Sequence, residues 1–304
     1  MPLKNQKPFC LLAVLGLSLV LGASANDPAP LGTSFNRLIH EAAVALLKEG
    51  NARYLSGKSQ HPNLDAERRA STVADGQEPL ATILACSDSR EPVELIFDRG
   101  IGDLFVVRVA GNIAGVSELA TVEYGVGHLN TPLLVVMGHT KCGAVTAVVK
   151  GAELHGHLPA LAEKIKPAVE LARTQTADPD AVVPAAIRAN VLHTIGDIIS
   201  QSSIVREKLI AGKVQIVGAV YDLEQGTVAW LGAHPDEQKM LALASVSESA
   251  TDHHKTAPVK TVPPPFAHPS EAAGSRGSPT NKSPAAPPPQ APPAHHDGAP
   301  GKHH

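Results

Sequence analysis

The chain has 304 residues, of which 43% are hydrophobic and only 3% aromatic, so a folded core must consist mainly of Val, Leu, Ile and Ala. Its formal net charge is −3 at pH 7, and its basic residues are not clustered. This charge balance argues against a protein that binds nucleic acid through bulk electrostatics.

The first 25 residues have the pattern of a secretory signal peptide. Lys4 and Lys7 precede an apolar stretch at residues 9–21, and small residues at 23–25 (Ala-Ser-Ala) form a cleavage site. The apolar stretch is shorter than the about 20 residues that a membrane-spanning helix needs. We therefore expect a periplasmic or secreted protein with no membrane attachment after cleavage; the alternative is a retained membrane anchor.

Residues 26–250 form a segment in which apolar, β-branched runs alternate with runs of helical period. Strands are predicted at residues 80–85, 104–109, 133–137 and 215–221, followed by an antiparallel partner at 226–231. Helices are predicted at residues 36–57, 117–129, 144–150, 159–174 and 185–211. The alternation predicts one α/β domain with a mostly parallel central sheet, about four parallel strands plus an antiparallel edge strand, flanked by helices.

Residues 251–304 have a different composition, with 13 of the 26 prolines and 7 of the 15 histidines. A segment without apolar periodicity cannot bury enough surface to offset the entropy of ordering it. We predict a disordered Pro/His-rich tail. It serves either as a soluble spacer or as a weak metal-capturing segment.

Two short motifs carry residues with metal-binding chemistry. Cys86, Asp88 and Arg90 follow the first predicted strand, and His139 and Cys142 follow the third. The carboxyl ends of parallel strands meet at one edge of a sheet, so the two motifs are expected to lie together. Two thiolates and an imidazole are a zinc ligand set that leaves a fourth position for water or an acidic side chain. The sequence therefore predicts one Zn²⁺ per chain, bound by Cys86, His139 and Cys142.

The cysteine count allows a second interpretation. Cys10 lies in the predicted signal peptide, so the mature chain has only Cys86 and Cys142. In an exported protein, two cysteines would by default suggest a disulfide. Both lie in metal-binding motifs that a disulfide would not require, so we favour zinc.

The pair of motifs, Cys-x-Asp-x-Arg and His-x-x-Cys, resembles that of the β-class carbonic anhydrases. Residues 49–54 (EGNARY), 105–112 (FVVRVAGN) and 122–125 (VEYG) resemble further segments of that family, and the match runs from about Phe35 to Trp230. The resemblance implies a zinc-dependent carbonic anhydrase domain with a β-carbonic anhydrase-like fold. It also implies reversible hydration of carbon dioxide to bicarbonate and a proton by a zinc-bound hydroxide that an Asp–Arg dyad orients.

The resemblance assigns the dyad to Asp88 and Arg90. In an open site Asp88 pairs with Arg90, and in a closed site Asp88 becomes the fourth zinc ligand. The residues of the allosteric bicarbonate pocket found in some family members are not recognisable here, so we expect the open site at neutral pH. A plain ion pair at the end of a strand is the alternative interpretation.

The family pattern also places four residues around the substrate: Gln77, Phe97, Tyr124 and Gly143. On sequence grounds alone, Phe97 and Tyr124 are more typical of core positions than of a substrate pocket. In this family the pocket commonly forms where two subunits meet. The resemblance therefore implies a homodimer or a higher homo-oligomer.

One residue departs from the family pattern, because Glu91 stands where an apolar residue is usual. Two further functions are compatible with the motifs. One is a zinc hydrolase that acts on carbon disulfide or carbonyl sulfide, and the other is a non-catalytic periplasmic zinc-binding protein. The Asp88–Arg90 dyad argues against the last, since a storage site does not need an orienting pair.

Overall fold

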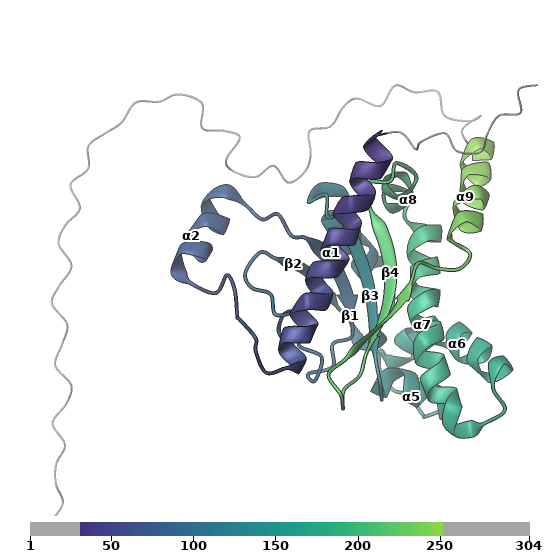
Figure 1. Ribbon diagram of the computed structural model, residues 1–304. Coiled ribbons are helices and arrows are strands. Elements are labelled where there is room, and N and C mark those ends of the chain that lie inside the picture. Colours follow the sequence, from purple (N-terminus) through teal and green to yellow (C-terminus); the bar gives the residue numbers. More distant parts are fainter. Residues whose placement is uncertain (1–30, 252–304) are drawn as a thin grey trace, which may run out of the picture. The chain divides into compact units, whose positions relative to one another are not determined.

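The computed structural model describes residues 31–251, so the predicted signal peptide and all but the first residue of the predicted tail lie outside the described part. A five-stranded sheet forms the centre of the described domain (Figure 1). Its order is β2-β1-β3-β4-β5, with β5 antiparallel to β4 and every other neighbouring pair parallel. The strands are β1 Ala81–Ala85, β2 Leu104–Arg108, β3 Leu133–His139, β4 Gln215–Tyr221 and β5 Val228–Gly232. This architecture confirms the predicted fold class.

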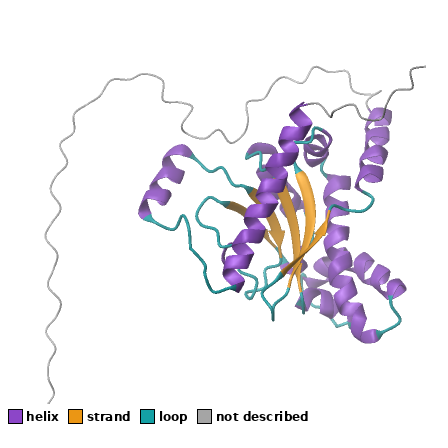
Figure 2. Ribbon diagram, in the orientation of Figure 1, coloured by secondary structure: helices purple, strands orange, loops and turns teal. Residues whose placement is uncertain are grey.

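Helices cover both faces of the sheet, which Figure 2 shows in a second colouring. They are α1 Leu31–Leu55, α2 Ala66–Asp75, α3 Val93–Ile96, α4 Val116–Glu123, α5 Gly143–Val149, α6 Leu158–Gln175, α7 Pro179–Gln201, α8 Ser203–Ile210 and α9 Glu237–Thr251. A short 3₁₀ turn, Ala110–Asn112, follows β2, and a π-helical turn, Tyr124–His128, extends α4.

Alternation along the central strand β3 separates the core into two layers. Leu134 and Val136 pack in the cluster that includes residues of α4 to α8, whereas Leu133, Val135 and Met137 pack in the cluster with α1 and α3. Successive side chains of a strand point to opposite faces, so a strand covered on both sides is apolar at every position. Each such fully buried side chain stabilises the fold by roughly 2 kcal/mol.

Some helices differ from the sequence prediction. The predicted helix 185–211 is two helices, because the chain breaks at Ser202. The Ser202 hydroxyl accepts a hydrogen bond from the Val205 amide, which caps α8, and it donates to Glu123 of α4. The sequence did not predict α2, α3 or α9. The first of these has no buried residue, and α3 is a single turn, so neither carries a clear apolar period.

Candidate metal centre

The three predicted metal ligands come together at the carboxyl edge of the sheet. Cys86 directly follows β1, His139 is the last residue of β3, and Cys142 immediately precedes α5. Because β1 and β3 are neighbouring parallel strands, their ends bring the two motifs side by side. Lys141 adopts a left-handed backbone conformation (φ 57°) in the turn that returns Cys142 toward His139. The potential ligand atoms of Cys86, His139 and Cys142 all lie within 4.8 Å of one another, and all three residues are buried.

The histidine is oriented so that one ring nitrogen is available. His139 Nδ1 lies 2.9 Å from the carbonyl oxygen of Thr140, so Nδ1 carries the hydrogen and donates it. Nε2, which is buried, then carries the lone pair, and it has no hydrogen-bond partner within residues 31–251. A buried acceptor without a donor is unfavourable unless a metal ion occupies its lone pair. This arrangement, with two cysteines outside any disulfide in the described chain, fits zinc.

The two thiols differ in acidity. A hydrogen bond from Cys142 lowers the pKa of Cys86 against the opposing effect of burial, and contacts with His139 and the Gly111 amide lower it further. The same contact between the thiols, together with burial, raises the pKa of Cys142. Burial lowers the pKa of His139, but the Cys86 sulfur and Glu91 outweigh burial and raise it overall. The three groups thus form one strongly coupled electrostatic cluster, as expected of a site built for a cation.

Asp88 and Arg90 form the predicted pair. Arg90 donates from Nε to Asp88 Oδ1 at 2.9 Å and from Nη2 to Oδ2 at 2.7 Å, and the Arg90 amide donates to Oδ1 at 3.0 Å. These hydrogen bonds hold the pKa of Asp88 well below its usual range. Asp88 Oδ2 lies 3.8 Å from His139 Nε2, which places the carboxylate beside the metal ligands. The Asp88 side chain is 17% exposed and that of Arg90 is 57% exposed, so the pair lies at the mouth of the centre.

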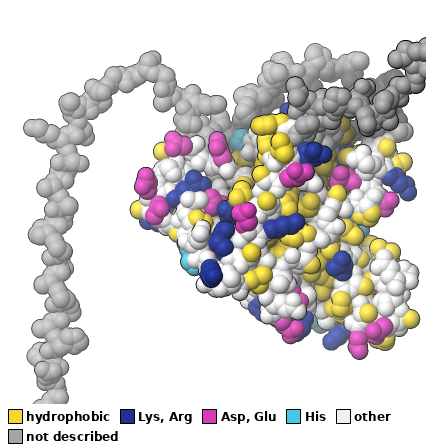
Figure 3. Space-filling model, in the orientation of Figure 1, with side chains coloured by type: hydrophobic (Ala, Val, Ile, Leu, Met, Phe, Trp, Pro, Cys, Tyr) yellow, Lys and Arg dark blue, Asp and Glu magenta, His cyan; other side chains and the backbone are white. Residues whose placement is uncertain are grey.

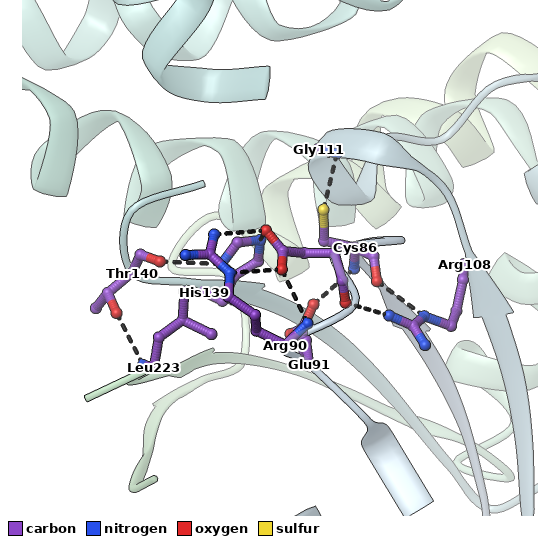
Figure 4. A network of polar contacts seen from close by, with 9 residues as sticks. Cys86, Arg90, Glu91, Arg108, Gly111, His139, Thr140 and Leu223 are labelled. Atoms are coloured by element: carbon purple, nitrogen blue, oxygen red, sulfur yellow. Dashed lines mark hydrogen bonds and ion pairs between the residues drawn. The ribbon is translucent and has the colours of Figure 1, made fainter. Parts of the chain in front are cut away.

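Cys86 is held by residues that the sequence analysis did not assign to the site (Figure 4). The Gly111 amide donates to Cys86 Sγ at 3.3 Å. The buried side chain of Asn190 in turn holds Gly111, because Asn190 Nδ2 donates to the backbone carbonyl oxygen of Gly111 at 2.7 Å. Arg108 donates from Nε to the Cys86 carbonyl oxygen at 2.9 Å. Glu91 accepts a hydrogen bond from the Cys86 amide at 3.1 Å. These four residues lie on separate elements and are not metal ligands. Their positions in the sequence therefore form no motif that could have identified them.

Glu91 is the residue that departs from the family pattern, and it is fully buried. Burial, and to a smaller extent the negative charge of Cys86, raise the pKa of Glu91 to about 8 against the opposing effects of His139 and Arg108. Its Oε1 atom has no hydrogen-bond partner within the described residues. Burying a carboxyl group with one unpaired oxygen costs folding free energy, which interactions elsewhere in the structure must offset.

The four predicted substrate residues occupy separate places. Gly143 lines a cavity of about 280 Å³ beside α5, and its missing side chain leaves open space. Tyr124 stacks on Phe105 at 5.7 Å between ring centroids. Phe97 is fully buried in the core, 6.2 Å from the ring of Trp230. Gln77 lies half-buried in the loop between α2 and β1. Of the four, only Gly143 lines this cavity, and the assignment of all four to the substrate stays a prediction.

The cavity at Gly143 is lined almost wholly by apolar groups. Ala110, next to the Gly111 that contacts Cys86, lines the cavity together with Leu154 from the loop between α5 and α6 and Leu158 at the start of α6. Its remaining lining residues are Ala144, Ala147, Val148, Leu161, Ala162 and Ile165. A lining of this kind suits a small uncharged molecule better than an ion.

The known proteins that this chain resembles in sequence and in structure are all described as carbonic anhydrases. A family model described as carbonic anhydrase matches residues 81–228. "Carbonic anhydrase 2" of Mycobacterium tuberculosis is 40% identical over 189 residues, which cover 61% of this chain and 89% of that protein. A carbonic anhydrase of Mycolicibacterium smegmatis is 37% identical over 192 residues, covering 62% and 91%. Among solved structures, the β-carbonic anhydrase CafA of Aspergillus fumigatus is similar with a TM-score of 0.53 and 31% identity, covering 68% of this chain and 97% of that one.

Proposed function

The chain belongs to the β-class carbonic anhydrases, zinc enzymes that interconvert carbon dioxide and bicarbonate, and we propose that Cys86, His139, Cys142, Asp88 and Arg90 form its active site. The observation that supports this assignment most strongly is the buried cluster of three ligand atoms with Asp88 beside it. The family membership favours hydration of carbon dioxide over the other reactions that the motifs alone allowed.

Zinc would be held by the two thiolates and by His139 Nε2. When bound, it supplies a Lewis acid that activates water at neutral pH. Thr140 fixes the imidazole through the hydrogen bond at Nδ1, so Nε2 points into the cluster without rearrangement. The Gly111 amide hydrogen bond stabilises negative charge on Cys86.

Asp88 orients the reacting water by accepting its hydrogen bond, which directs an oxygen lone pair toward carbon dioxide. Because Arg90 binds both carboxylate oxygens, Asp88 remains ionised throughout the neutral range and accepts a hydrogen bond instead of taking up the proton. The same two hydrogen bonds hold Asp88 in the pair with Arg90, which supports the open state of the site. Closure by Asp88 as a fourth ligand would require those bonds to break.

Carbon dioxide is uncharged and apolar, and the apolar cavity at Gly143 is lined by Gly143 and Ala110, the chain neighbours of Cys142 and Gly111. We assign this cavity to the substrate side of the site. Gln77, Phe97 and Tyr124 are assigned to the proposed pocket by the family pattern alone.

Stopped-flow hydration of carbon dioxide at pH 7 to 8.5, with zinc assayed in parallel, tests the assignment. We expect one zinc per chain and an activity that Asp88→Asn lowers at least about 100-fold, since the substitution misorients the reacting water. Cys142→Ser should lose zinc and activity together. Asp103→Asn, which removes a largely buried carboxylate that is paired with Arg68 outside the metal centre, is the matched control and should leave the activity per folded zinc site unchanged. Full zinc occupancy without hydration in the wild-type protein would contradict the proposal.

We also propose that the protein is a homo-oligomer assembled through α1. Phe35, Leu38 and Leu46 are 64%, 59% and 40% exposed on this helix, and hydrophobic side chains gather over this region in Figure 3. An apolar stripe of this kind is typical of an interface. Leu38→Glu should shift the sedimentation coefficient to that of a smaller species. Leu171→Glu, on an equally exposed site of α6, should not.

Export to the periplasm is proposed from residues 1–25 alone. Fractionation of expressing cells, with the amino terminus of the mature protein determined by mass spectrometry, tests it. We expect the periplasmic form to begin at Asn26, and a cytoplasmic protein that retains Met1 would contradict the proposal. Deletion of residues after 251 should leave turnover unchanged if the tail is only a spacer.

A further inference from the structure

Arg108 reaches from one strand to the active-site loop that follows another. It is the last residue of β2 and is paired with Ala85, the last residue of β1. From this position Nε donates to the carbonyl oxygen of Cys86 at 2.9 Å, and Nη2 donates to the carbonyl oxygen of Asp88 at 2.6 Å. One side chain therefore binds the backbone of a metal ligand and of the dyad carboxylate at once (Figure 4).

The geometry of a guanidinium suits this task. Its donors are held in a rigid plane, so two hydrogen bonds to carbonyls two residues apart fix the orientation of both peptide groups. The direction of each peptide plane determines where the Cα–Cβ bond of its residue points. Arg108 thus restricts both the Cys86 sulfur and the Asp88 carboxylate, although it contacts neither side chain.

Other contacts hold the same loop from the opposite side. Glu91 accepts a hydrogen bond from the Cys86 amide, and the Gly111 amide donates to its sulfur. Cys86 is consequently restrained at its nitrogen, its carbonyl oxygen and its sulfur by three residues from separate segments. The carbonyl oxygen of Asp88 also accepts a hydrogen bond from the Glu91 amide at 3.0 Å, in addition to the bond from Arg108. Loss of Arg108 should therefore loosen both the metal ligand Cys86 and the dyad residue Asp88.

We propose that Arg108 is a positioning residue that sets the geometry of the metal ligand Cys86 and of Asp88 relative to each other. The inference rests on the proposed zinc site. It adds Arg108, on the edge strand β2, to the five residues proposed for the active site. Its role is exerted through backbone carbonyls, so it depends on the two-donor fork and not on positive charge alone. Lysine, a single-point donor, can satisfy only one carbonyl well.

The test compares Arg108→Ala and Arg108→Lys with wild type, using cobalt(II)-substituted protein and zinc-loaded protein. The visible absorption of bound cobalt reports ligand geometry, and the rate of zinc transfer to a chromogenic chelator reports how firmly the ligands are held. For Arg108→Ala we expect altered cobalt bands, zinc transfer about 10-fold faster, and a kcat lowered about 10-fold or more at unchanged KM. Arg108→Lys should lie between Arg108→Ala and wild type.

Arg206→Ala is the matched control, because Arg206 also donates to two backbone carbonyls, those of Ile199 and Ser200, at 2.9 and 3.0 Å. It should lower the melting temperature without changing cobalt bands or zinc transfer. If Arg108→Ala retains wild-type bands and transfer rate, or changes only stability as Arg206→Ala does, the proposal is wrong. Should Arg108→Ala fail to fold, Arg108→Lys decides on the same readouts. A wild-type protein without hydration activity would contradict the proposed function, while the cobalt spectra would still test the role of Arg108.

Discussion

Two buried acids flank the single-turn helix α3, and the fold treats their charges in opposite ways. Asp98, after the helix, accepts hydrogen bonds from Arg53 Nε at 2.6 Å and from the amides of Gln60 and His61. Glu91, before the helix, accepts one hydrogen bond from Cys86, and its second oxygen is unpaired within residues 31–251. Burial opposes ionisation at both, but the hydrogen bonds lower the pKa of Asp98 to about 2, whereas the pKa of Glu91 is raised to about 8.

The comparison shows that burial alone does not decide the charge of an acid. The number and charge of its hydrogen-bond donors decide it. Asp98 connects the end of α1 to the loop at residues 60–61 and so stabilises the scaffold. Glu91 lies in the loop that carries Cys86 and Asp88. Such departures from full hydrogen bonding concentrate at functional sites.

The largest effect is expected from Asp98→Asn. The substitution leaves the Arg53 cation facing a neutral amide and weakens the hydrogen bonds from both backbone amides. We expect the free energy of unfolding to fall by about 3 kcal/mol, because breaking a buried, hydrogen-bonded pair leaves its partner uncompensated. Urea denaturation measures this, and hydration per folded zinc site should be unchanged.

Glu41→Gln is the control, since Glu41 pairs with Arg37 on the surface with both side chains more than half exposed. It should change stability by no more than about 0.5 kcal/mol. An Asp98→Asn protein as stable as Glu41→Gln would show that the Asp98 pair contributes nothing.

The next effect concerns acid pH. The folded-state pKa of Asp98 is depressed from 3.8 to about 2, so its stabilising contribution is complete above about pH 4 and is lost as the pH falls toward 2. The difference in unfolding free energy between wild type and Asp98→Asn should therefore shrink across that window. A difference that stays constant from pH 5 to 2 would mean that Asp98 titrates normally in the folded protein.

A smaller effect of opposite sign is expected from Glu91→Gln. The folded-state pKa of Glu91 is raised, so the folded wild-type protein binds the extra proton and loses stability as the pH rises from about 4.5 to 8. Glutamine retains the acceptor for the Cys86 amide and cannot ionise. With both proteins equally loaded with zinc, we expect Glu91→Gln to be more stable than wild type at pH 9 and similar at pH 5. Calorimetry at the two pH values checks this, and a variant less stable at pH 9 would contradict it.

Much of the fold could be predicted from the sequence, because the strand signals are strong. The predicted strand 215–221 agrees with β4 at both ends, and the first three strands agree to within two residues. Predictions were poorer where local signals compete. At the break, Ser202 combines a local cap on the Val205 amide with a contact to Glu123, 79 positions away in the chain, and no local pattern contains the second contact. The helix α2 buries none of its residues, so apolar periodicity does not mark it.

The sequence by itself identified the candidate metal ligands Cys86, His139 and Cys142 and the neighbouring pair Asp88 and Arg90, because their spacing after apolar strands allows few other interpretations. Only the tertiary structure decided how that set is supported. Arg108, Glu91 and Gly111 come from a neighbouring strand, a helix entrance and a turn, and their roles depend on strand pairing and on distances of about 3 Å. The physical reason is that a metal ligand requires a particular residue type, which a sequence displays. A positioning contact to the backbone requires only a donor or acceptor at the right place, which folding alone creates.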